Sequence, residues 1–111
     1  MNKQELAITK KIAEIEGREW RTDKEAGVIT VSTMNRWNEG GIKCCSWYEY
    51  NPFDWSILGP LMKKYEVSVQ HAIEYVFITQ GWKDIEVSFD GEEPLGLERA
   101  ILECIIKRQE A

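Results

Sequence analysis

The sequence predicts an α+β fold in which a small antiparallel or mixed β-sheet carries helices on both faces, as in an α/β/α sandwich. Both ends of the 111-residue chain repeat apolar side chains at helical spacing, whereas the middle alternates them in short runs typical of strands. One domain spanning residues 1–111 is long enough to bury a core without disulfides or metals. Hydrophobic residues make up 43% and charged residues 30%, so we do not expect disorder.

The first predicted helix covers residues 2–16. Apolar side chains recur along one side of it: Ile8, Ile12 and Ile15. Asn2 can cap the start of this helix, and Gly17 can end it. The polar segment 18–27 that follows is predicted to be a loop.

A β-hairpin is predicted next. Residues 28–33 and 42–50 alternate in the manner of strands, and the segment 34–41 between them is rich in turn-forming residues. Neither face of the second strand is plainly polar, which indicates that part of each face is covered.

The second predicted helix begins at Asp54, after the turn that Asn51-Pro52 imposes. Apolar residues follow at helical spacing as far as Tyr65. Pro60 complicates this helix, because a proline in a helix interior costs about 3 kcal/mol. We therefore expect a loose first turn over residues 54–58.

Residues 67–79 have two interpretations. Their apolar residues fit helical spacing, yet the run is dense in β-branched and aromatic residues and follows a helix almost directly. We predict a strand here, with a helix as the alternative. A turn at Gln80-Gly81 then leads to a strand over residues 82–89.

The last helix is predicted to open at Glu92-Glu93-Pro94, where acidic side chains and a proline suit the first turn. Its apolar side chains spread over a wide arc, broader than one sheet face requires. This width predicts packing against a neighbouring helix or subunit, and hence a homodimer.

Catalytic and metal-binding chemistry are not predicted. His71 is the only histidine, so one chain supplies neither a histidine-based triad nor a multi-histidine metal site. Cys44, Cys45 and Cys104 match no zinc or redox spacing, and we interpret them as reduced thiols that act as small apolar groups. We expect no cofactor, no metal and no enzymatic activity.

The residues expected to bind a partner lie in two loops. Arg36 and Trp37 fall in the glycine-flanked loop 34–41, and Trp82 lies beside a turn; tryptophan and arginine are typical interface anchors. The net charge of −5 disfavours binding of a nucleic-acid backbone by bulk electrostatics. We therefore expect a protein-binding module, with stacking on single-stranded nucleic acid as the alternative.

Several short motifs carry a family resemblance: LAITKKIAEIEG near the start, YNPFDW followed by Gly59-Pro60, KKYEVSV, and EEPLGLERAILECIIK near the end. With these motifs the chain resembles the small phage proteins of the NinX type, which are related to phage ABA sandwich domains. The resemblance implies a phage- or prophage-encoded accessory protein, and it implies no reaction and no site residues.

The N-terminal segment shows neither a secretion signal nor a membrane span. Together with the resemblance, this predicts a protein of the bacterial cytoplasm that does not enter the membrane.

Overall fold

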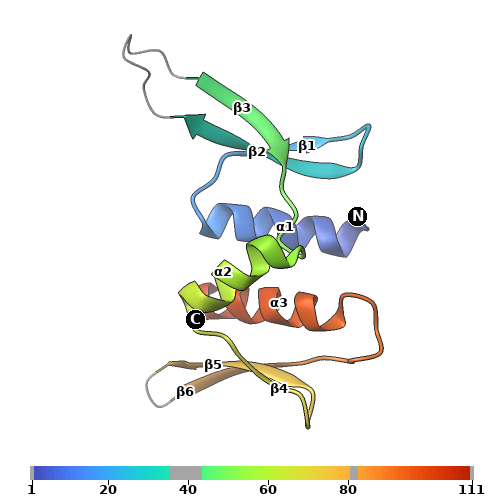
Figure 1. Ribbon diagram of the computed structural model, residues 1–111, viewed down its shortest axis with the longest axis vertical. Coiled ribbons are helices and arrows are strands. Elements are labelled where there is room, and N and C mark those ends of the chain that lie inside the picture. The colour runs from blue at the N-terminus through green and yellow to red at the C-terminus, as the bar shows by residue number, and fades with distance from the viewer. Residues whose placement is uncertain (1, 36–43, 81–82, 111) are drawn as a thin grey trace. The chain divides into compact units, whose positions relative to one another are not determined.

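The computed structural model describes residues 2–35, 44–80 and 83–110 (Figure 1). Over these residues three helices and six strands occur, and the strands form two three-stranded antiparallel sheets. The predicted α+β class is therefore confirmed, but the described strands form two sheets where one was predicted. By its internal contacts the chain divides into two compact units, Met1–Asn51 (unit 1) and Pro52–Ala111 (unit 2), and the single domain stays a prediction. Along the described ranges, no helix is long and apolar enough to cross a membrane.

Helix α1 (Lys3–Ile15) opens unit 1 and is capped at both ends. The side-chain oxygen of Asn2 accepts a hydrogen bond of 2.8 Å from an amide of the first turn, which has no partner inside the helix. At the other end Gly17 takes a φ of 67°, and the Arg18 amide donates to the Ala13 carbonyl at 2.9 Å. Asn2 and Gly17 therefore bound the helix as predicted.

Sheet A of unit 1 consists of β1 (Trp20–Asp23), β2 (Val28–Asn35) and β3 (Cys44–Glu49), in that order. Both pairs of strands are antiparallel, so the predicted hairpin is confirmed. The prediction of a loop over residues 18–27 is wrong at residues 20–23, because β1 pairs with β2 along its whole length, and it holds for the turn at 24–27. Most side chains of β1 are exposed, so this strand lacks the apolar alternation that would reveal it in the sequence.

Helix α1 covers one face of sheet A. On that face Ile29 and Val31 of the central strand are fully buried, and α1 contacts β1 and β2. The helix contributes four buried residues: Ile8, Thr9, Ile12 and Ala13. Alternate residues of a strand point to opposite faces, so the register places Arg21 and Trp47 on the face of the sheet that α1 does not cover.

Helix α2 (Trp55–Tyr65) begins unit 2 at the predicted cap. The Asp54 carboxylate accepts a hydrogen bond of 2.9 Å from a backbone amide of the first turn, and this bond lowers the pKa of Asp54. The expectation of a loose turn over residues 54–58 is wrong, since the chain is α-helical from Trp55 onward and continues through Pro60. Gly59 makes this easier, because it has no Cβ to meet the proline ring that follows.

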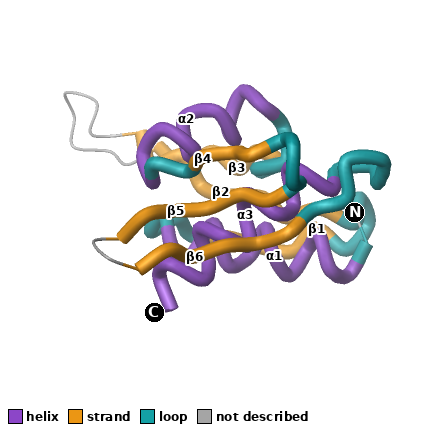
Figure 2. Tube along the Cα trace, turned by 90° about the horizontal axis from the view of Figure 1, so that it is seen from below, coloured by secondary structure: helices purple, strands orange, loops and turns teal. Residues whose placement is uncertain are grey.

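Sheet B of unit 2 is formed by β4 (Ser68–Gln70), β5 (Tyr75–Gln80) and β6 (Lys83–Ser88), which pair antiparallel in that order. The strand predicted over residues 67–79 is interrupted, because a turn at 71–74 divides it into β4 and β5. Figure 2 shows the three strands side by side with α3 behind them.

Helix α3 (Gly96–Glu110) packs on one face of sheet B and also contacts α2. It begins after Pro94 rather than at the predicted opening. An added Cβ at Gly96 would collide with the Asp90 carbonyl oxygen, so only glycine fits at this entry. The buried residues of the helix are Gly96, Ala100, Ile101, Leu102, Cys104 and Ile105. Strands β5 and β6 together with α2 therefore account for much of the wide apolar arc, and the homodimer stays a prediction.

The Cys104 thiol is fully buried in α3, where its Sγ donates to the Ile85 carbonyl at 3.4 Å. Burial raises the pKa of this thiol from 9.0 to about 11. Between these values the unfolded chain loses the proton and the folded chain keeps it, so we expect stability to fall as pH rises from 9 toward 11. Urea unfolding of the wild type and of Cys104→Ser, which does not titrate, checks this: their stability difference should change over that range and not below it.

Candidate partner-binding surfaces

The three residues predicted to bind a partner, Arg36, Trp37 and Trp82, lie outside the described residues. In the chain, Arg36 and Trp37 fall between β2 and β3, and Trp82 falls between β5 and β6. They therefore belong to hairpins of two different units. The β2–β3 hairpin belongs to sheet A and the β5–β6 hairpin belongs to sheet B. Described side chains on these two sheets form candidate surfaces.

An arginine–tryptophan stack lies on the face of sheet A that α1 leaves uncovered. The guanidinium carbon of Arg21 is 3.8 Å from the centroid of the Trp47 ring. The strand register explains this contact, because Arg21 pairs with Thr30 and Trp47 pairs with Ser32, so the two lie diagonally across one face. Arg21 is exposed and Trp47 is half-buried, so a partner can reach the stack.

Acidic side chains border this stack. Glu49 also pairs with Thr30, in the row of Arg21, and Asp23 lies two positions from Arg21 along β1. Both carboxylates are exposed on the same face as the stack. We call these four residues, Arg21, Trp47, Asp23 and Glu49, the Arg21/Trp47 surface. Its charges are mixed in sign.

A second arginine–aromatic cluster lies where α1 ends. Arg18 Nη1 donates to the Tyr48 hydroxyl at 2.8 Å, and the Arg18 guanidinium carbon is 5.6 Å from the centroid of the Tyr50 ring. The glycine turn that ends α1 places Arg18 beside β3. An open hollow adjoins the cluster and is lined by Gly17, Arg18, Glu19 and Ser32. Tyr48 is 37% exposed and Tyr50 is buried, so the cluster offers one phenol and one guanidinium to solvent.

Arg18, Arg21 and Trp47 were not among the predicted binding residues. Two turn signals could have revealed the strand that carries Arg21. The Asp23 carboxylate accepts hydrogen bonds from two amides of the following turn, and Gly27 closes that turn with a φ of 67°. An aspartate and a glycine four residues apart, ahead of a β-branched run, therefore mark the β1–β2 hairpin.

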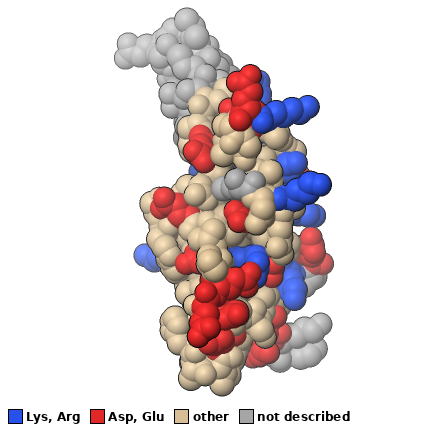
Figure 3. All heavy atoms as spheres, turned by 90° about the vertical axis from the view of Figure 1, so that its right-hand side faces the viewer, with Lys and Arg blue, Asp and Glu red and all other residues tan. Residues whose placement is uncertain are grey.

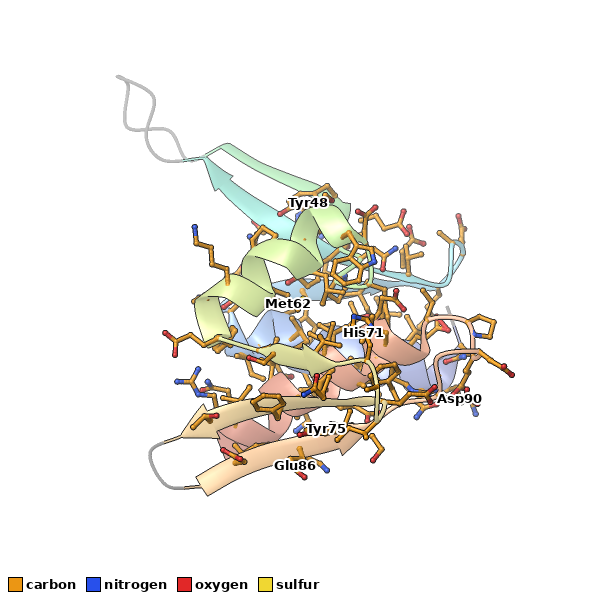
Figure 4. The ribbon with its side chains drawn as sticks, turned by 60° about the horizontal axis from the view of Figure 1, so that its bottom comes forward. Tyr48, Met62, His71, Tyr75, Glu86 and Asp90 are labelled. Carbon is orange, nitrogen blue, oxygen red and sulfur yellow. The ribbon has the colours of Figure 1, made fainter. Side chains whose placement is uncertain are left out.

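One face of sheet B carries two aromatic rings. Val76, Ile78 and Val87 are buried on the face that α3 covers. By alternation, Tyr75 and Phe77 lie on the opposite face, where their ring centroids are 5.5 Å apart and both rings are half-buried. Figure 4 labels Tyr75 together with Glu86, which comes from the neighbouring strand. We call this side of the sheet the open face of sheet B.

The acidic excess of the chain belongs to unit 2. Residues 1–51 contain eight acidic and eight basic side chains, whereas residues 52–111 contain eleven acidic and six basic ones. The net charge of −5 therefore falls entirely on unit 2. In the view of Figure 3, Asp and Glu side chains gather most densely in the lower part of the face shown. The connection between β6 and α3 exposes Asp90, Glu92 and Glu93.

The four aromatic residues around Pro52 divide between the core and the surface. The Trp55 side chain is 49% exposed, and its indole Nε1 donates to Glu98 at 3.3 Å. Tyr48 is also exposed, whereas Tyr50 and Phe53 are buried. Two of these four aromatic side chains are therefore available to solvent.

The described titratable side chains do not converge on a metal site. In the part of the chain that the structure describes, no three His, Cys, Asp or Glu side chains form a group that could hold a metal ion. His71 is exposed in the β4–β5 turn, with its ring centroid 6.4 Å from that of Phe89 in an edge-on arrangement. His71 is therefore a surface residue.

Searches of family models, curated proteins and solved structures found no match to the chain. The resemblance to phage proteins stays a prediction.

Proposed function

We propose that the chain is a protein-binding module without catalytic activity, and that the Arg21/Trp47 surface contacts the partner. The observation that carries this proposal is the guanidinium of Arg21 held 3.8 Å above the Trp47 ring, on the face of sheet A that α1 leaves uncovered. Tryptophan and arginine are the side chains most enriched at the energetic centres of protein interfaces. The stack also orders the long arginine side chain in advance, which lowers the entropy cost of binding.

The charges around the stack favour a protein over a nucleic acid. Glu49 and Asp23 are exposed on the same face as Arg21, so a phosphate approaching the arginine would meet two carboxylates. Unit 1 as a whole is neutral, with eight acidic and eight basic residues. Protein interfaces commonly combine a central aromatic or arginine anchor with a polar rim. The proposal includes the cytoplasm of a bacterial host as the place of action, as the resemblance to phage accessory proteins implies.

Replacing Trp47 or Arg21 with alanine should weaken partner binding by about 30-fold, the effect of losing an interface anchor worth about 2 kcal/mol. Immobilised wild-type protein would first select a partner from bacterial lysate, and calorimetry with the purified partner would then give the affinity of each variant. Lys24→Ala is the matched control for Arg21→Ala, and Trp55→Ala is the control for Trp47→Ala, because both control residues are exposed.

Two results would contradict the proposal. In the first, the wild type retains no protein beyond what an empty column retains. In the second, a partner binds the Arg21→Ala and Trp47→Ala variants as tightly as it binds the controls.

A second candidate is binding of single-stranded nucleic acid by unit 1. Two cationic side chains there lie near half-buried tryptophan rings: Lys10 at 5.2 Å from Trp20, and Arg21 over Trp47 on the opposite face of sheet A. A base can stack on such a ring. Fluorescence anisotropy with a labelled oligodeoxythymidylate at low salt separates the two candidates. A salt-sensitive rise that Trp47→Ala removes would favour this one, and a flat titration would eliminate it.

A further inference from the structure

No described element of unit 2 covers the open face of sheet B. Helix α3 contacts β5 and β6, and the buried residues Val76, Ile78 and Val87 lie on the face toward it. Seen from below in Figure 2, the three strands lie in front of α3, with no other described element of unit 2 across them. Tyr75 and Phe77 therefore present their rings on an uncovered side of the sheet.

The charged side chains described on this face are all acidic. Glu86 pairs directly with Phe77, and Asp84 pairs with Thr79 one position further along the face. Both carboxylates are exposed. The other cross-strand partners of the two aromatic residues are uncharged and polar: Ser68, Gln70 and Ser88. The face thus combines aromatic rings with carboxylates.

We propose that the open face of sheet B binds an arginine- or lysine-bearing segment of a protein partner. A cation placed over Tyr75 or Phe77 is attracted by the negative face of the ring and, at the same position, by the Glu86 carboxylate beside it. The excess of acidic residues in unit 2 attracts such a segment from a distance and repels nucleic acid. A second copy of the chain would present the same acidic face, which disfavours pairing of two open faces.

This inference concerns a different surface from the Arg21/Trp47 surface, and the two can fail separately. The variants that test the first lie on sheet A, and those that test the second lie on sheet B. A defined peptide serves as the probe here, so the result does not depend on isolating a partner.

The test is a titration of ¹⁵N-labelled full-length protein with three short blocked peptides, in which arginine, lysine or glutamate alternates with glycine. We expect the arginine and lysine peptides to shift the amide resonances of β5 and β6 and the glutamate peptide to leave them unchanged. Raising the ionic strength from about 0.05 M to about 0.5 M should weaken the shifts, because exposed charges are then screened.

Two substitutions assign the binding to this face. Glu86→Gln removes the charge, and Phe77→Leu removes the ring while keeping an apolar side chain; each should weaken binding of the arginine peptide about threefold. Two control variants test this assignment. Glu92→Gln removes an exposed charge from the β6–α3 connection and should weaken binding less than Glu86→Gln does. Phe89→Leu removes another half-buried ring of unit 2 and should not weaken it. Spectra of the free variants that match the wild type outside the substituted site verify that each is folded.

The inference is overturned if the arginine peptide leaves β5 and β6 unshifted, or if the glutamate peptide shifts them as much. It is also overturned if Glu86→Gln and Glu92→Gln weaken binding equally, since the attraction would then be a property of net charge alone. Shifts confined to sheet A would likewise place the binding elsewhere.

Discussion

Replacing Ile101 with alanine should lower the free energy of unfolding of unit 2 by about 2–5 kcal/mol. Ile101 has no exposed surface and lies in the middle of α3, the helix that packs on β5 and β6. The substitution removes buried apolar atoms and leaves a cavity that close-packed neighbours fill only in part. Sheet B has no other described cover within its own unit, so the loss should reach β5 and β6 as well.

Urea unfolding followed by circular dichroism measures this loss, and hydrogen exchange of the β5 and β6 amides shows whether it reaches the sheet. Ile73→Ala is the matched control, because Ile73 is 65% exposed and should change stability by no more than about 0.5 kcal/mol. A loss at Ile101 no larger than that of the control would mean that α3 does not form the core of unit 2.

Replacing Pro60 with alanine should stabilise the chain by about 1–2 kcal/mol. Pro60 is exposed and lies inside α2, where it cannot donate to the Ser56 carbonyl and where its ring crowds the preceding turn. Alanine restores the donor and has the highest helix propensity. Part of the gain is lost, because proline also restricts the unfolded chain. Thermal unfolding of the purified variant measures the net effect, and a lower midpoint than that of the wild type would contradict it.

Gly59 gives the control for this explanation. Space around Gly59 is open, since an added Cβ would have no atom within 4 Å apart from the adjacent residues and the backbone of its own helix. In the Pro60→Ala background, Gly59→Ala should therefore stabilise the helix by about 0.5–1 kcal/mol. With Pro60 present, the new Cβ meets the proline ring, so the same change should gain less or destabilise. Equal effects in the two backgrounds would mean that the glycine is not there to accommodate the proline.

The parts of the fold that could be predicted carry strong local signals. Asn2 and Gly17 bound α1, and Asp54 caps α2, because each residue type suits the backbone geometry of its position. The turn-rich segment after β2 revealed the hairpin with β3. These signals act over a few residues, so one sequence is enough to read them.

The errors arise where backbone pairing or an atypical turn residue decides the structure. Strand β1 is held by pairing with β2 while most of its side chains face solvent, so its sequence has no apolar period. The β4–β5 turn contains Ile73, an exposed apolar residue, and closes with Glu74 at a φ of 49° where glycine would be typical. Both features make the sequence resemble one uninterrupted strand.

The candidate surfaces could not be predicted because each depends on register across strands. Arg21 reaches Trp47 from the other edge of sheet A, a contact that exists only if β1 is a strand and pairs as observed. The turn at 71–74 determines where β5 begins, and this places Tyr75 and Phe77 on the open face of sheet B. The sequence predicted Arg36, Trp37 and Trp82 from residue type and loop position, and both can be read without knowing how the strands pair.

Unit 2 also contains a reserve of stability that protein engineering could use. Glu66 at the end of α2, Glu74 in the β4–β5 turn and Leu95 before α3 all adopt the left-handed backbone conformation, with φ between 49° and 58°. A non-glycine residue in this conformation lowers the stability of the fold by about 1 kcal/mol, whereas glycine adopts it without strain. The substitution Glu66→Gly, at the exposed end of α2, could recover part of that energy. It would alter neither the core, nor the Arg21/Trp47 surface, nor the open face of sheet B. A redesign for thermostability would therefore begin at these three non-glycine positions with positive φ.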